Sequence, residues 1–292
     1  MAIWKSIKTL TELKKNVKTA NHLEVDDRII DNVEEMADQF NSYFTTVAEK
    51  LRSQLSNTPC DLSKLFSFVK SRKDPEVQFS IPAITSSQIG RIILKISPNK
   101  TSGIDKISAR FLRMAAPAIS DSLAKIINLS FTQGKFPSGW KIAKVTPIYK
   151  SGTESDPSNY RPISVLPVVS KIIERHMHDS LYAYLINHNL IYSRQSGFRK
   201  WHSSETALIK IIDYLLLNLH KNQLSGMVLV DYRKAFDMVD HTLLLEKLRL
   251  YGIAKQELQW CQSYLYKRKQ VVHLSGAKFS EALVKHGIPV VS

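Results

Sequence analysis

The chain has 292 residues, of which 41 are Lys or Arg and 26 are Asp or Glu, so its formal net charge is +15. With 43% hydrophobic residues, a chain of this length can bury a packed core, which excludes wholesale disorder. The two cysteines, Cys60 and Cys261, exclude a disulfide scaffold and a thiolate zinc site. The charge favours a polyanionic partner, with nucleic acid ahead of an anionic membrane, although solubility also explains many basic domains.

The sequence predicts neither a transmembrane helix nor a secretory signal. No run of about 18 apolar residues is uninterrupted. Residues 1–10 alternate lysine with apolar residues and lack the continuous apolar core of a signal peptide. We therefore expect an intracellular protein with reduced thiols, in the nucleus or cytoplasm, that is neither secreted nor bound to a membrane.

The N-terminal region predicts helices joined by a polar segment. Apolar residues recur three and four positions apart over residues 31–55, as on one helix face. Residues 56–84 show no stable period and are expected to be a linker. Thr85 and Gln88 form a possible capping box for a helix that continues to Pro98.

The remaining sequence predicts a mixture of helices and a few strands. The elements expected before residue 227 are a polar loop at 99–105, helices at 107–117 and 119–133, a hairpin of strands 143–149 and 160–165, and helices at 170–188 and 204–219. The apolar run 227–230 ends abruptly at Asp231, as when a buried strand presents a carboxylate at its edge. The elements expected after it are helices at 241–251 and 255–266 and paired strands at 270–274 and 282–284. This order predicts the α+β class rather than regular β–α alternation.

The segment from Val230 to His241, which reads Val-Asp-Tyr-Arg-Lys-Ala-Phe-Asp-Met-Val-Asp-His, resembles motif A of reverse transcriptases from non-LTR, LINE-like retrotransposons. The other segments that resemble motifs of this family, in the same order, are 99–105, 140–152, 159–164 and 193–198. The resemblance extends from about residue 85 to residue 292. Residues 1–55 resemble the connector that joins an endonuclease domain to the polymerase in these elements.

The resemblance implies the fingers and partial palm of a right-hand polymerase, with a helical N-terminal extension. The expected divisions are a helical connector and linker at 1–84, fingers with part of the palm at 85–225, and a partial palm from motif A to a truncated motif B at 226–292. The implied partners are an RNA template, a DNA primer and deoxynucleoside triphosphates. The implied cofactor is Mg²⁺ or Mn²⁺, with no organic cofactor, and the oligomeric state is not predicted.

Candidate site residues follow from the same motifs. Nucleotide transfer needs two divalent cations about 4 Å apart, held by oxygen ligands. The resemblance makes Asp231 the catalytic, metal-binding carboxylate and the carbonyl of Tyr232 a further ligand, whereas an isolated Asp more often caps a helix. It makes Phe236 the aromatic residue that packs against the sugar and rejects a 2′-hydroxyl, the alternative being an ordinary core Phe. Lys150 and Arg161 would contact the incoming triphosphate, the alternative being solvated surface charges.

Other charged residues suit a nucleic-acid partner or a structural role. Residues 140–200 contain nine Lys or Arg against four Asp or Glu, which suits an RNA template and an A-form heteroduplex. Residues 267–269, Lys-Arg-Lys, either do the same or form a solvated turn. Asp240 is expected at the entry of a helix. His176 and His178 are two apart and do not share a helix face, so we predict no metal site there.

Two departures from the family bear on activity. Where its motif B reads Gly-apolar-Pro-Gln-Gly-Ser, this chain reads Gly-Ile-Pro-Val-Val-Ser at 287–292, which removes an amide and a flexible glycine from the nucleotide pocket. Tyr-x-Asp-Asp is absent, and the only Asp pair, Asp26 and Asp27, is expected to be a surface turn. We therefore expect an incomplete two-metal site and no primer extension by this chain alone. The alternatives are a non-catalytic RNA- or DNA-binding relic and a relic without function.

Overall fold

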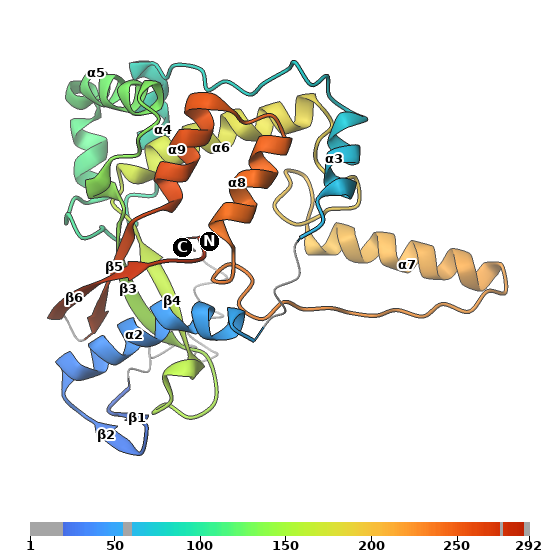
Figure 1. The fold of residues 1–292 in the computed structure, drawn as a ribbon. Helices are drawn as coiled ribbons and strands as arrows, with labels where there is room; N and C mark the ends of the chain where they lie inside the picture. Colours follow the sequence, from blue (N-terminus) through green and yellow to red (C-terminus); the bar gives the residue numbers. More distant parts are fainter. Residues whose placement is uncertain (1–19, 55–59, 275–276, 289–292) are drawn as a thin grey trace, which may run out of the picture.

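A computed structural model of the chain describes residues 20–54, 60–274 and 277–288 (Figure 1). The predictions for residues 1–10, for most of the motif B segment and for part of the connector lie outside these ranges. Helices flank a four-stranded sheet, and residues 23–30 form a second, two-stranded sheet, so the predicted α+β class is confirmed. None of the described helices is both long enough and apolar enough to cross a membrane.

The larger sheet has the strand order β4-β3-β5-β6. Its strands are β3 (Ile142–Tyr149), β4 (Tyr160–Val165), β5 (Arg268–Leu274) and β6 (Ala277–Val284). The predicted hairpin is confirmed, because β3 and β4 pair antiparallel with Tyr149 opposite Tyr160. The predicted pairing of the last two strands is also confirmed, since β6 runs antiparallel to β5. β5 runs parallel to β3, which leaves β4 and β6 as the edges of the sheet.

Helix α2 (Val33–Arg52) covers one face of this sheet and confirms the helix predicted at 31–55 (Figure 1). Phe40 is fully buried against Tyr160 of β4, with ring centroids 4.8 Å apart. The side-chain nitrogen of Gln270 on β5 donates to the side-chain oxygen of Asn41 at 2.9 Å. The apolar stripe of α2 therefore makes a core with the alternate side chains of β3, β4 and β5.

A second core lies among the helices on the other side of the sheet (Figure 1). Its elements are α4 (Ser86–Lys95), α5 (Ala109–Thr132), η1 (Ser138–Trp140), α6 (Ser170–Asn187), α8 (His241–Leu250) and α9 (Lys255–Leu265). Trp260 of α9 packs against the rings of Phe131 and Phe136, with centroids 5.2 and 5.4 Å away. The predicted helices at 170–188, 241–251 and 255–266 are confirmed, as is the capping box of α4.

The remaining short elements are β1 (Leu23–Val25), β2 (Arg28–Ile30) and η2 (Pro157–Asn159). β1 and β2 form a hairpin whose turn holds Asp26 and Asp27, both exposed and both at positive φ. Asp tolerates the left-handed region better than most residues. The prediction that this Asp pair forms a surface turn is confirmed.

The prediction that residues 56–84 form a linker is wrong. Helix α3 (Ser63–Lys70) lies within them, with Val69 buried, and the chain after it buries Phe79 and Ile84 in the helical core. A helix of about two turns shows too few repeats for its period to stand out from the sequence. Packing against the rest of the molecule stabilises so short a helix.

The two helices predicted at 107–117 and 119–133 form one helix, α5, with Pro117 in its interior. A proline inside a helix removes one hydrogen bond and costs about 3 kcal/mol, which made a break the simpler expectation. Leu123 and Ile127 of the same helix are buried in the core. Burial of this apolar face offsets the cost of the proline.

The buried strand predicted at 227–230 is also wrong. These residues belong to no strand, and their side chains are exposed, Val228 by 87%. They follow α7 (Ser204–His220), which matches the helix predicted at 204–219, and Figure 1 shows α7 projecting away from the other elements with the chain returning beside it. A run of apolar residues indicates that a segment favours burial, but it does not indicate which surface covers the segment. No described strand pairs with residues 227–230.

A glycine in the predicted polar loop 99–105 allows a close approach of two backbones. A Cβ atom added to Gly103 would lie 2.6 Å from the backbone nitrogen of Pro167. We expect Gly103→Ala to lower the free energy of unfolding by about 1–3 kcal/mol, measured by denaturant unfolding followed by circular dichroism. Gly139→Ala is the matched control, because a Cβ atom there meets no atom within 4 Å. Equal effects of the two substitutions would contradict this account.

Candidate functional site

Residues 231–240 connect the projecting segment to α8. Asp231 and Tyr232 are exposed at the start of this connection. Phe236 is 42% exposed, and its ring meets that of Phe198 edge-on at a centroid distance of 6.0 Å. The segments 193–198 and 230–241, both singled out by their motifs, therefore touch through two aromatic rings. Phe236 is not a fully buried core residue.

The motif B segment folds back onto the motif A segment. The backbone N–H of Gly287 donates to the carbonyl of Val239 at 3.0 Å, and that of Ile288 donates to the carbonyl of Phe236 at 3.1 Å. Gly287 has φ +79°, and a Cβ atom there would lie 2.8 Å from the Cα of Asp237. Only glycine combines this φ with so close an approach. The sequence singled out Gly287 by motif, but not this contact.

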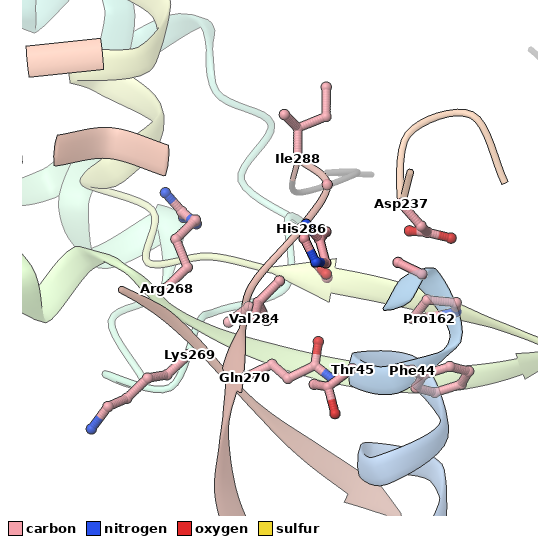
Figure 2. A pocket seen from close by; sticks show the side chains of 14 residues that line it. Phe44, Thr45, Pro162, Asp237, Arg268, Lys269, Gln270, Val284, His286 and Ile288 are labelled. Atoms are coloured by element: carbon pink, nitrogen blue, oxygen red, sulfur yellow. The ribbon is translucent and has the colours of Figure 1, made fainter. Parts of the chain in front are cut away.

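Asp237 lines a small cavity between α2, the sheet and residues 286–288 (Figure 2). Burial raises the pKa of Asp237, and the ammonium of Lys234 partly offsets this. Lys234 in turn lies over the ring of Tyr43 on α2, 4.7 Å from its centroid. The cavity measures about 60 Å³, whereas ligand pockets are typically about 300–1,000 Å³. It has room for water molecules but not for a nucleotide.

Lys150 and Arg161 come together on one face of the hairpin. Arg161 pairs with Ile148 across the two strands, and the N–H of Lys150 donates to the carbonyl of Asn159. Since alternate residues share a face, Lys150 and Arg161 are diagonal neighbours on the same face, and both are exposed. Pro162, which lines the cavity beside Asp237, points to the opposite face. Because β4 is an edge strand, both faces can be reached around its edge.

The described residues do not form a complete metal site around Asp231. Mg²⁺ prefers six oxygen ligands and is usually held by one or two carboxylates. No group of three or more His, Cys, Asp or Glu side chains within the described ranges could hold an ion. Asp237 lies in the small cavity, and Asp240 is bound to Arg52. Of the three aspartates in the motif A segment, only Asp231 is therefore both exposed and free of these contacts.

The basic residues 267–269 divide into two kinds. Lys267 and Lys269 are exposed, but Arg268 is only 4% exposed, which corrects the expectation of a solvated turn for this residue. Its Nη1 donates to the carbonyl of Tyr264 at 2.9 Å, and its guanidinium lies 4.7 Å from the Tyr264 ring centroid.

These cations also affect Lys141, which precedes β3. Burial lowers the pKa of Lys141, and the charges of Arg268 and Lys267 lower it further. Positive charge therefore accumulates where β5 begins.

Asp240 caps α8, which confirms its predicted place at a helix entry. Its carboxylate accepts the N–H of Leu243 at 2.8 Å and pairs with Arg52 of α2. The Leu243 N–H and the Arg52 guanidinium hold the pKa of Asp240 below its usual range. The sequence pattern indicated the cap but not the partner from α2.

We expect Asp240→Ala to lower the free energy of unfolding by about 1–2 kcal/mol at neutral pH. Because the pKa is lowered in the folded state, this stabilisation is present above the unfolded pKa of about 4 and disappears as the pH falls through the folded value. Urea unfolding at neutral pH and at about pH 3 measures the change. Asp121→Ala, on the exposed side of α5, is the control. A loss that is equal at both pH values would contradict the assignment.

Comparison with known proteins identifies the class. Residues 148–291 match the family described as "Reverse transcriptase (RNA-dependent DNA polymerase)". With the five ordered motifs, this match and the relatives below show that the chain belongs to the reverse transcriptase family, which is a family of RNA-directed DNA polymerases.

The relatives are polymerases of non-LTR retrotransposons, so the resemblance to LINE-like elements is confirmed. The RNA-directed DNA polymerase from mobile element jockey of Drosophila melanogaster is 30% identical over 221 residues, covering 73% of this chain and 23% of the relative. The probable polymerases from transposon BS and transposon X-element of the same species are 28% and 26% identical, each covering 73% of this chain and 24% of the relative. The chain thus spans about a quarter of the length of these relatives.

Proposed function

We propose that this chain supplies the part of a non-LTR retrotransposon polymerase that holds the RNA template, the DNA primer and the incoming deoxynucleoside triphosphate. The observation that carries the proposal is the pair of exposed cations, Lys150 and Arg161, on one face of the β3–β4 hairpin. Phosphoryl transfer depends on positioning and on neutralising the charge of the triphosphate. A planar guanidinium beside a flexible ammonium suits a chain of phosphates.

We propose that Phe236 contacts the sugar of the incoming deoxynucleoside triphosphate. Its partly exposed ring lies on the motif A connection and contacts the ring of Phe198 edge-on. The backbone carbonyl of Phe236 accepts the N–H of Ile288, which fixes the chain at this residue. The cavity beside Asp237 is too small for a nucleotide. The proposed binding surface is therefore the open edge of β4, between the hairpin cations and Phe236.

Asp231 is the proposed catalytic carboxylate, with the carbonyl of Tyr232 beside it. Divalent cations, Mg²⁺ or Mn²⁺, would supply activation of the primer hydroxyl and stabilisation of the leaving oxygen. The described residues contribute this one exposed carboxylate to such a site and no group of three ligands. We therefore propose that these residues bind substrates without catalysing transfer.

The divisions 1–84, 85–225 and 226–292, with fingers in the second and partial palm in the third, remain part of this proposal. Strands β3 and β4 come from the second division and β5 and β6 from the third, and all four belong to one sheet. Helix α2, from the first division, covers that sheet. We propose that the three divisions act as one substrate-binding body.

The proposal is tested by binding and extension assays on the whole chain. We expect binding of an RNA–DNA heteroduplex whose affinity falls steeply with salt and depends little on sequence. With Mg²⁺, template, primer and deoxynucleotides we expect no extension. If the unsubstituted chain extended the primer and the Asp231→Asn variant did not, the proposed lack of turnover would be contradicted, and the proposed role of Asp231 would be supported. Absence of heteroduplex binding at low salt would overturn the proposed function itself.

A further inference from the structure

Helix α2 contacts the motif A segment both before and after Phe236. Before it, the ammonium of Lys234 lies over the ring of Tyr43, and its Nζ donates to the Tyr43 hydroxyl at 3.3 Å. After it, the carboxylate of Asp240 pairs with the guanidinium of Arg52. Tyr43 and Arg52 are separated by about 13 Å along the helix axis. Phe236 therefore lies, in the sequence, between two contacts to the same helix.

The backbone between these two contacts depends on its surroundings for its shape. Residues 231–240 belong to no helix or strand. Within them, the N–H of Met238 donates to the carbonyl of Lys234 at 3.0 Å and closes a single turn. Lys234 has φ +50°, a conformation that residues other than glycine rarely adopt and that persists where surrounding contacts hold it. The contact of the Lys234 side chain with Tyr43 is such a contact.

The position of the Phe236 ring follows from the position of its backbone. The ring is 42% exposed, and the Phe198 ring that it meets edge-on belongs to a side chain that is itself 86% exposed. Two such exposed rings do not form the close packing that fixes a side chain in a protein core. The backbone carbonyl of Phe236, by contrast, accepts the N–H of Ile288 at 3.1 Å. A shift of the backbone would therefore carry the ring with it.

We propose that Tyr43 and Arg52 of α2 are positioning residues, which hold Phe236 where its ring excludes the 2′-hydroxyl of a ribonucleotide. This role rests on the proposed function of Phe236 as the contact to the sugar. A ring excludes a hydroxyl by occupying its space, so a displacement of about 1 Å gives the hydroxyl room. The proposed triphosphate contacts, Lys150 and Arg161, lie on the β3–β4 hairpin instead. Loss of an α2 contact should therefore raise the affinity for a ribonucleotide and leave the affinity for a deoxynucleotide nearly unchanged.

Competition titration of the whole chain tests this role, with dATP or ATP displacing a fluorescent deoxynucleotide in the presence of Mg²⁺. We expect the unsubstituted chain to bind dATP at least about tenfold more tightly than ATP, and Phe236→Ala to abolish this preference. Arg52→Ala and Tyr43→Leu are each expected to reduce the preference about three- to tenfold, through tighter binding of ATP. Arg52→Lys keeps a positive charge opposite Asp240 and should retain most of the preference.

Asp38→Ala is the matched control on the same helix. The carboxylate of Asp38 accepts the hydroxyl of Ser280 on β6 and so contacts the sheet rather than the motif A segment. We expect this variant to keep the full preference for dATP. Arg52→Ala leaves the bond from the N–H of Leu243 to Asp240 in place, so α8 keeps its cap. Circular dichroism of each variant verifies that the fold is kept.

The possible outcomes distinguish α2 from Phe236. If Phe236→Ala removed the preference and neither α2 variant reduced it, the positioning role of α2 would be overturned, and the proposed contact of Phe236 with the sugar would stand. Equal losses of affinity for dATP and ATP in the α2 variants would also overturn the positioning role, because they would show a purely structural one. An unsubstituted chain without any preference would overturn the proposed role of Phe236 and, with it, that of α2.

Discussion

Replacing Trp260 with alanine is expected to lower the free energy of unfolding by about 3–5 kcal/mol, the largest effect of any single substitution considered for this protein. Trp260 is 2% exposed and stacks on Tyr264 with an interplanar angle of 6°. Its Nε1–H donates to the hydroxyl of Ser130 at 3.0 Å. The substitution therefore leaves a cavity between α5 and α9. It also removes the bond that the Ser130 hydroxyl accepts, while that hydroxyl still donates to the carbonyl of Lys135 at 2.6 Å.

Trp201→Ala is the matched control for this prediction. The Trp201 side chain is 97% exposed, so its loss should change the free energy of unfolding by no more than about 0.5 kcal/mol. Thermal and urea unfolding, followed by far-ultraviolet circular dichroism, measure both variants. A Trp260 variant as stable as the Trp201 variant would show that the helical core around α9 is not packed as described.

Removal of both hairpin cations, Lys150→Ala with Arg161→Ala, is expected to weaken the binding of a deoxynucleoside triphosphate on the order of a hundredfold. A hydrogen bond to a charged group contributes about 1.5–3 kcal/mol, and exposure of both side chains places each at the lower end of that range. The two contributions add only if both side chains reach the same triphosphate, which their shared face permits. Equilibrium titration with a fluorescent deoxynucleotide measures the change.

Lys125→Ala controls for the loss of positive charge, because Lys125 is exposed on α5, away from the hairpin. We expect this variant to bind the triphosphate as the unsubstituted chain does. A deoxynucleoside monophosphate should bind the double variant and the unsubstituted chain equally weakly, because it lacks the β- and γ-phosphates that we propose the two cations contact. If the double variant bound the triphosphate normally, Lys150 and Arg161 would be solvated surface charges.

The fold could be predicted from the sequence wherever the signal is local. The apolar spacing of α2, the capping box at Thr85 and the turn between the strands of the hairpin all act within a few residues. The same holds for Asp240 as a helix cap. The continuity of α5 through Pro117 could not be predicted, because the core contacts that compensate for the proline come from distant segments.

The candidate site divides in the same way. The motifs singled out Asp231, Phe236, Lys150 and Arg161 from sequence alone, and the roles of these residues remain predictions. The structure adds what spacing cannot report, such as the approach of Gly287 to Asp237. It also shows that two consecutive residues of β4, Arg161 and Pro162, lie on opposite faces of the sheet, with only Pro162 lining the small cavity.

By itself, the sequence determined the α+β class, most of the helices and the reverse transcriptase family, since periodicity, caps and ordered motifs are properties of short segments. Only the tertiary structure decided the parallel pairing of β3 with β5, the burial of Arg268 and the exposure of residues 227–230. The physical reason is that a pattern of apolar residues specifies which sides of a segment avoid water. It does not specify which distant surface will cover them.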